Sequence, residues 1–206
     1  TKNNYQSLMD HLGSGKAWDL SRKREGLFIL PPFGEESAVT NSRVEHLASI
    51  SRFLGNSRED YVVLSDCDTV CNIDFSAVLA YHLEKEADIT VVYRYGKIPL
   101  GLGDPSVYTI APDGRVLDML ISPNMDGECN FGMSILIMRR DLLMRMVSDC
   151  VSRNLFNFKR DFLQRNLKDY RVFGYEFEGC ARATCSMNSY FEANMSLMLP
   201  KIRGEL

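Results

Sequence analysis

Two aspartates at the end of an apolar run are the residues of this chain whose types and spacing most clearly suggest chemistry. The run Tyr61-Val-Val-Leu64 is rich in β-branched residues, and Asp66 and Asp68 follow it closely. A segment with helical spacing (72–86) and a second apolar run (87–93) come next. Strand, helix and strand within about 35 residues predict a parallel βαβ unit. Open parallel sheets bind ligands at the carboxyl ends of their strands, so a metal or phosphate site is expected at these carboxylates.

The surrounding pattern predicts a single α/β domain that positions this unit. Helices are expected at 1–12, 43–54, 141–150, 161–167 and 187–199, strands at 26–30, 132–138 and 170–176, and loops at 37–39, 94–105 and 122–130. The Asp113-Gly114 turn between 106–110 and 116–121 predicts a β-hairpin. Ser186 is the expected N-cap of the last helix.

Composition excludes several classes of protein. With 206 residues and 45% apolar content, the chain can bury one sizeable core. A net charge of −3 argues against nucleic acid as a partner, because phosphate-binding surfaces need a basic excess. No apolar run has the length of a membrane span, and the polar start is unlike a secretory signal. Six cysteines without a disulfide-like framework predict buried, reduced thiols and a cytoplasmic setting.

A series of short motifs runs through the chain in a fixed order. The segments are Ser7-Leu-Met-Asp-His11, Gly15-Lys-Ala-Trp-Asp-Leu20, Gly26-Leu-Phe-Ile-Leu-Pro-Pro32, Asn72-Ile-Asp-Phe75, Ala87-Asp-Ile-Thr-Val91, Phe177-Glu-Gly179 and Ser189-Tyr-Phe-Glu-Ala-Asn194. Together they resemble the ADP-glucose pyrophosphorylase (glucose-1-phosphate adenylyltransferase) family. The resemblance implies that 1–206 is a Rossmann-like nucleotidyltransferase domain with a mostly parallel mixed sheet. It also implies a fragment that lacks the family's first strand, with its glycine-rich loop, and its C-terminal β-helix.

The chain departs from the family at positions that carry charge. Catalytic members join ATP to glucose 1-phosphate, and carboxylates hold Mg²⁺ against the phosphates. Asp68 matches one metal-binding aspartate, but the second falls on Ala183. The lysine that grips the sugar phosphate falls on Ser122, and the aspartate of a "DFG" motif falls on Asn157. A sugar-contacting serine falls on Gly132. We therefore expect no intact catalytic residue, a remnant of the metal site at Asp68, and no bound Mg²⁺.

These losses favour one functional interpretation, while two others stay open. The pattern resembles the non-catalytic GlgD-type subunit, which would associate with catalytic glucose-1-phosphate adenylyltransferase chains and regulate or stabilise them in ADP-glucose and glycogen synthesis. This chain alone would then be inactive, and its partners would include neither nucleic acid nor a membrane. Alternatively, the protein is an active sugar-phosphate nucleotidyltransferase of altered specificity, with Mg²⁺ on Asp68. In a third interpretation, the old cleft binds a sugar nucleotide or sugar phosphate as an effector without turning it over.

Overall fold

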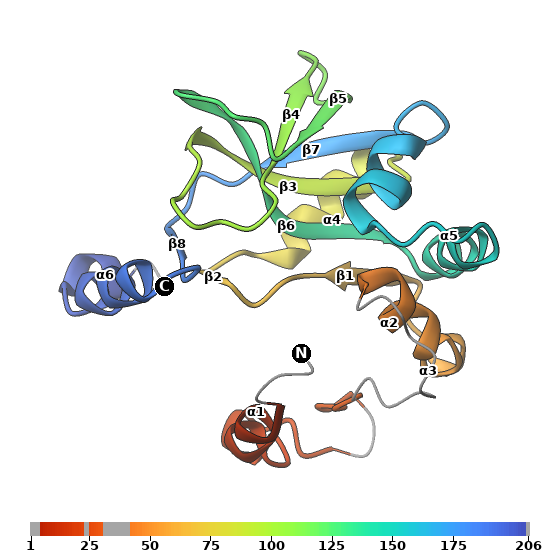
Figure 1. The fold of residues 1–206 in the computed structure, drawn as a ribbon. Coiled ribbons are helices and arrows are strands. Elements are labelled where there is room, and N and C mark those ends of the chain that lie inside the picture. The colour runs from red at the N-terminus through yellow and green to blue at the C-terminus, as the bar shows by residue number, and fades with distance from the viewer. Residues whose placement is uncertain (1–4, 23–24, 31–41, 205–206) are drawn as a thin grey trace.

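The structure, a computed structural model, describes residues 5–22, 25–30 and 42–204. Its helices are α1 (Tyr5–Leu12), η1 (Lys16–Trp18), α2 (Arg43–Ser49), α3 (Ser51–Asn56), α4 (Phe75–Glu84), α5 (Arg140–Ser152), η2 (Phe158–Leu163), η3 (Gln164–Asn166), α6 (Met187–Leu197) and α7 (Pro200–Arg203). Its strands are β1 (Tyr61–Leu64), β2 (Thr69–Cys71), β3 (Ile89–Lys97), β4 (Ser106–Ile110), β5 (Val116–Ile121), β6 (Glu128–Arg139), β7 (Val172–Glu176) and β8 (Ala181–Ala183). Helices and strands are mixed along the chain, as the sequence predicts for an α/β fold, but the strands β3 to β6 follow one another without a helix between them (Figure 1).

The central sheet has six strands in the order β5-β4-β6-β3-β7, with β1 also paired to β6. Strands β3 and β7 are parallel, whereas the β1–β6, β3–β6, β4–β5 and β4–β6 pairs are antiparallel. The expectation of a mostly parallel sheet is therefore wrong, and the sheet is mixed and mostly antiparallel. The cause is β6, a 12-residue strand that pairs with three others and runs against all of them.

The two strands and the helix of the predicted βαβ unit are present, but the two strands are not neighbours in the sheet. Strands β1 and β3 run in the same direction, since each is antiparallel to β6. They do not pair with each other, because β6 lies between them. Nothing in 61–93 reveals this insertion, since β6 comes from 128–139 and a strand's neighbours depend on long-range pairing.

Two apolar clusters cover the two faces of the sheet. On one face, Val91 and Tyr93 of β3 pack with α2, α5 and η2. On the other face, Val92 of β3 packs with Val78 of α4 and with β6. The alternation along β3 follows the two-residue period of a strand. His82 of α4 lies within this second layer, 2% exposed, with its Nδ1 2.8 Å from the hydroxyl of Thr90.

Several local expectations are confirmed and others need correction. The hairpin β4–β5, the buried strand β6 and the Ser186 cap of α6 are as predicted. Residues 26–30 form no strand, the helix predicted at 43–54 is interrupted at Ile50, and β3 and β6 extend into the loops predicted at 94–105 and 122–130. The helix predicted at 161–167 is a π-helix followed by a 3-10 turn, and 37–39 lie outside the described residues. Strands β2 and β8 have no counterpart in the prediction.

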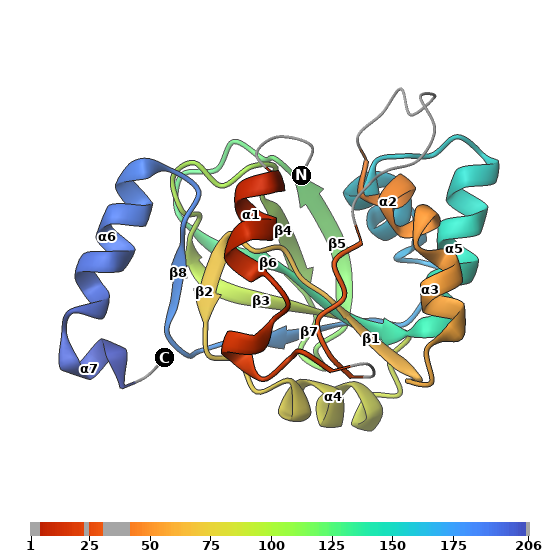
Figure 2. The ribbon, with the colours of Figure 1, turned by 90° about the horizontal axis from the view of Figure 1, so that it is seen from below.

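Strand β1 lies at an edge of the described sheet. Strand β1 pairs with β6 on one side, and within the described residues no strand pairs with its other side. Helix α1 lies beyond that side of β1, and α6 stands at the opposite end of the molecule from α5 (Figures 1 and 2).

All six cysteines are free thiols, but Cys129 and Cys150 alone are buried. None of the helices in the described ranges is both long and apolar enough to cross a membrane.

Candidate functional site

The two aspartates follow β1, as the sequence predicts, and lie in a bend that connects it to the unpredicted strand β2. This bend is attached to β8 through the backbone of Asp68, whose carbonyl oxygen accepts hydrogen bonds from the Thr184 N–H at 2.7 Å and from its hydroxyl at 3.0 Å. Beyond the bend, β2 and β8 form a two-stranded antiparallel sheet in which Thr69 is opposite Ala183. The acidic bend and the end of β8 therefore form one rigid corner of the site.

A guanidinium from α2 faces the first aspartate. Arg43 lies 3.2 Å from a carboxylate oxygen of Asp66, and its guanidinium lies over the Phe158 ring at 4.7 Å. Arg43 is the first residue of α2, and a capping box between Ser42 and Glu45 fixes that helix start. The ion pair is partly buried, because the Arg43 side chain is 24% exposed. Helix capping thus places a positive charge against the acidic bend.

A second cation, Lys159, enters the same region from η2. Its ammonium group donates a hydrogen bond to the backbone carbonyl of Asp104 in the loop before β4. Burial lowers the pKa of Lys159 below its ordinary value of 10.5, and the carboxylates of Asp104, Asp66 and Asp68 act in the opposite direction. Arg43 adds a smaller lowering contribution to the same pKa. Lys159 therefore adds a second, partly buried positive charge that interacts electrostatically with three carboxylates.

Two of the predicted site positions serve local structure. Ser122 has a positive φ of 49°, and its hydroxyl donates to the Asp104 carboxylate at 3.0 Å. Asn157 is the N-cap of η2, and its side-chain oxygen accepts a hydrogen bond from the Arg160 N–H at 2.8 Å. Neither side chain offers a positive charge or a metal-binding carboxylate. The structure gives these residues the roles of a loop contact and a helix cap.

The residues present do not fit a divalent metal ion. The position across from Thr69 carries the methyl group of Ala183, which cannot coordinate Mg²⁺. The carboxylate of Asp66 is already paired with Arg43, and Lys159 supplies a second positive charge nearby. Among the described residues, no group of three or more His, Cys, Asp or Glu side chains could hold a metal ion. The expectation of a metal remnant at Asp68 therefore gains no support from its surroundings.

The position that the resemblance assigns to a sugar-contacting serine, Gly132, has no room for a side chain. A Cβ atom built on Gly132 would lie 2.9 Å from two atoms of the Tyr108 side chain, Cε2 and Oη. Tyr108 is buried, and its burial raises the pKa of its hydroxyl to about 12. Any side chain at position 132 would thus collide with an aromatic ring that has little room to move. Tyr108 occupies the space that a serine at this position would need.

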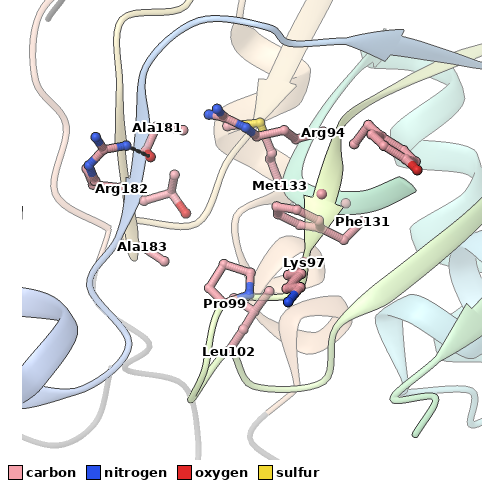
Figure 3. A pocket seen from close by; sticks show the side chains of 13 residues that line it. Arg94, Lys97, Pro99, Leu102, Phe131, Met133, Ala181, Arg182 and Ala183 are labelled. Carbon is pink, nitrogen blue, oxygen red and sulfur yellow. Dashed lines mark hydrogen bonds between the residues drawn. The ribbon is translucent and has the colours of Figure 1, made fainter. Parts of the chain in front are cut away.

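A cavity of about 330 Å³ remains between β8 and the β3–β6 pair. Figure 3 shows its apolar wall, which includes Phe131 and Met133, and the basic residues that line it from β3, Arg94 and Lys97. Arg94 donates a hydrogen bond to the Gly179 carbonyl at 2.8 Å, which leaves most of its N–H donors available. No carboxylate lines this cavity within the described part of the chain. The charged side chains that line the cavity are therefore all basic in the described part of the chain.

Sequence reasoning missed the residues that fill the site: Arg43, Tyr108 and Lys159. Arg43 and Tyr108 lie in an ordinary helix start and strand, so their local sequence gives no signal. For Lys159 the sequence does give a signal, because this residue stands two positions after Asn157, at the glycine of the "DFG" motif. A lysine at a motif glycine could have indicated a substituted site.

The known proteins that are similar to this chain are of the kinds that its motifs suggest. Over 100 residues, 47% of its length, the chain is 45% identical to the glycogen biosynthesis protein GlgD of Geobacillus stearothermophilus. The corresponding protein of Bacillus subtilis is 40% identical over 102 residues. A glucose-1-phosphate adenylyltransferase of Bacillus subtilis is 28% identical over 203 residues, or 93% of the chain. The chain spans 29%, 28% and 51% of the lengths of these relatives, respectively, and no family model matches it.

Proposed function

We propose that this chain, a GlgD-like protein of the ADP-glucose pyrophosphorylase family, acts in glycogen biosynthesis as a non-catalytic subunit. In this role it would regulate or stabilise catalytic glucose-1-phosphate adenylyltransferase chains in the cytoplasm. The observation that carries the proposal is the filled site. Ala183 stands at the metal position that the resemblance implies, Arg43 pairs with Asp66, and Lys159 adds a second positive charge nearby. Tyr108 occupies the space of the sugar-contacting serine.

The electrostatics of the reaction explain why this filling matters. Transfer of a nucleotidyl group needs cations placed against the reacting phosphates, because charge develops there in the transition state. Removal of one such group commonly costs a factor of about a hundred to a thousand in rate. Here both the metal ligand and the phosphate-binding lysine are replaced, by Ala183 and Ser122. Even if the two losses are not additive, little rate would be left.

A subunit without chemistry can act only through contacts with its partner. To change the rate of a catalytic chain, it must bind the active and inactive conformations of that chain with different affinity. We therefore expect a hetero-oligomer in which this protein shifts the partner between the two conformations, or protects the partner from unfolding. A pure spectator would bind without either effect.

The test combines purification with rate measurements. The full-length protein should form no ADP-glucose from ATP and glucose 1-phosphate when assayed alone. It should co-purify with the catalytic subunit of the same bacterium and change its kcat, its KM or its thermal half-life. Bovine serum albumin at equal concentration is the control for non-specific protection. Unchanged kinetics and half-life in the mixture would refute the regulatory role, and turnover by the chain alone would favour an active transferase of altered specificity.

The cavity beside β8 supports a second element of the proposal, an anionic effector such as a sugar phosphate or sugar nucleotide. The cavity lies between two basic residues of β3 and the strand that carries Ala183. Titration of the full-length protein with glucose 1-phosphate should show saturable binding that Lys97→Gln weakens about tenfold. The matched control is Lys201→Gln on α7, which also removes one exposed lysine. Equal affinity in the two variants would count against this element.

A further inference from the structure

The acidic bend after β1 is surrounded by positive charge that belongs to the protein itself. The Arg43 guanidinium lies 3.2 Å from Asp66. Lys159 donates a hydrogen bond to the Asp104 carbonyl, and the carboxylates of Asp66, Asp68 and Asp104 raise its pKa against the effect of burial. Arg43 and Lys159 also line one small cavity, together with Tyr108 and Phe158. The Arg43 side chain is 24% exposed and that of Asp66 is 43% exposed, so water screens this ion pair in part. Arg43 and Lys159 thus place two positive charges near the acidic bend.

These contacts join segments that are distant in the sequence. Arg43 connects α2 to the β1–β2 bend, while Lys159 connects η2 to the loop before β4 through the Asp104 carbonyl. Ser122, at the end of β5, donates to the Asp104 carboxylate and so joins the same loop. A divalent ion performs this kind of bridging when carboxylates from several segments share it. Here the bridging groups are side chains on a helix and a π-helical turn.

We infer that Lys159 and Arg43 are resident cations that replace the divalent metal ion and hold the site together without one. The carboxylates of Asp66 and Asp68 are then structural partners of these cations, and the corner between β1, β8 and η2 keeps one conformation at any concentration of Mg²⁺. This inference concerns metal dependence and goes beyond the proposed regulatory role. It would hold for an inactive subunit with or without an effect on a partner.

If Lys159 is a resident cation, Ala183→Asp and Lys159→Met should not act independently on metal affinity. Ala183→Asp alone should restore little metal binding, because Lys159 still opposes a divalent cation beside the carboxylates. Lys159→Met alone removes the resident charge but leaves the methyl group at position 183. Only the combination Ala183→Asp with Lys159→Met offers two carboxylates and no competing ammonium. Metal affinity should therefore rise much more in the double variant than the two single changes predict.

Mn²⁺ is the probe, because its binding to the full-length protein can be followed by electron paramagnetic resonance without any substrate. The wild-type protein should show no saturable Mn²⁺ site at millimolar concentration. The double variant should bind Mn²⁺ at least tenfold more tightly than either single variant. A matched control replaces Lys159→Met with Lys168→Met, an exposed lysine before β7, and should behave like Ala183→Asp alone. Because no partner is present, the result is independent of any effect on a catalytic subunit.

A second pair keeps the test decisive if the Lys159 variants do not fold. Ala183→Asp with Arg43→Met removes the other resident cation, and its control is Ala183→Asp with Arg52→Met on α3. Tighter Mn²⁺ binding in the Arg43 pair than in its control supports the inference. Saturable Mn²⁺ binding by the wild-type protein, equal to that of the double variants, would overturn it. Additive behaviour of Ala183→Asp and Lys159→Met would overturn it as well, since the lysine would then have no competing role.

Discussion

The contact between Gly132 and Tyr108 allows a direct test of whether the sugar side of the site is closed. Gly132→Ser introduces the residue that the family carries at this position. Its Cβ would lie 2.9 Å from Cε2 and Oη of Tyr108 and 3.1 Å from Cζ. Distances near 3.0 Å are shorter than real Cβ contacts allow, so the ring or the backbone must shift. The neighbour is a buried ring, 7% exposed, and not the end of a flexible side chain.

The expected cost follows from this geometry. Forcing extra atoms into a packed core typically destabilises a protein by about 1–3 kcal/mol. We expect Gly132→Ser to lower the free energy of unfolding by about 2 kcal/mol, measured by urea denaturation with an unchanged m-value. Tyr108→Val removes the ring and leaves a cavity, so it is destabilising by itself. In the double variant, the serine should cost much less than it does in the wild-type background.

The double-mutant cycle tests whether Tyr108 blocks a side chain at position 132 or moves aside for it. A coupling energy of about 1 kcal/mol or more between the two positions supports a closed sugar side. A wild-type stability for Gly132→Ser would refute the steric reasoning, because it would show that Tyr108 moves aside freely. Gly132→Ala is the matched control, since it adds the same Cβ without a hydroxyl. It should show most of the same cost.

Three further predictions follow from the packing and the buried groups. Burial lowers the pKa of His82 below 6.5, against a smaller opposing effect of Asp88, so the unfolded chain binds the proton more readily. The stability contributed by neutral His82 should therefore be complete above pH 6.5 and should be lost as the pH drops from 6.5 through the lower pKa of the folded state. The loss is about 1.4 kcal/mol for each pH unit between the unfolded and folded pKa values, and His82→Gln should remove this part of the pH dependence. Phe162 is completely buried and stacks on Phe158 at 4.6 Å, so Phe162→Ala should cost about 3–5 kcal/mol in urea denaturation, whereas a loss under 1 kcal/mol would contradict the assigned core. Ser186→Ala removes the hydroxyl that accepts the Ser189 N–H at 3.1 Å at the start of α6, and it should cost about 1 kcal/mol, with Ser196→Ala on the same helix as the control.

The elements that local sequence determines were predictable. The Asp113-Gly114 turn defined the β4–β5 hairpin, the apolar run at 132–138 indicated a buried strand, and Asp66 and Asp68 do follow a strand. Each of these depends on residues within a few positions of one another. The pairing of β6 between β1 and β3 depends on segments more than sixty residues apart in the case of β1, and no local pattern encodes it.

The site shows the same division between local and distant information. The replaced positions Ser122, Asn157 and Ala183 could be recognised from motifs, since each is defined by its own neighbours in the sequence. Among the groups that fill the site, Tyr108 is revealed only by its contact with Gly132. The lysine at the motif glycine can be noticed in the sequence, but its place near carboxylates from two other segments cannot. Substitution can be seen in sequence, whereas the structural response to it requires coordinates.

Within the described residues β1 is paired on one side only, which has a practical consequence for handling the protein. Its outer row of amide and carbonyl groups can accept another extended chain, and Val63 there is 43% exposed. Purified protein would then tend to self-associate through β1 and give misleading sizes in chromatography. A charged substitution such as Val63→Lys is a simple safeguard, because edge lysines discourage strand addition.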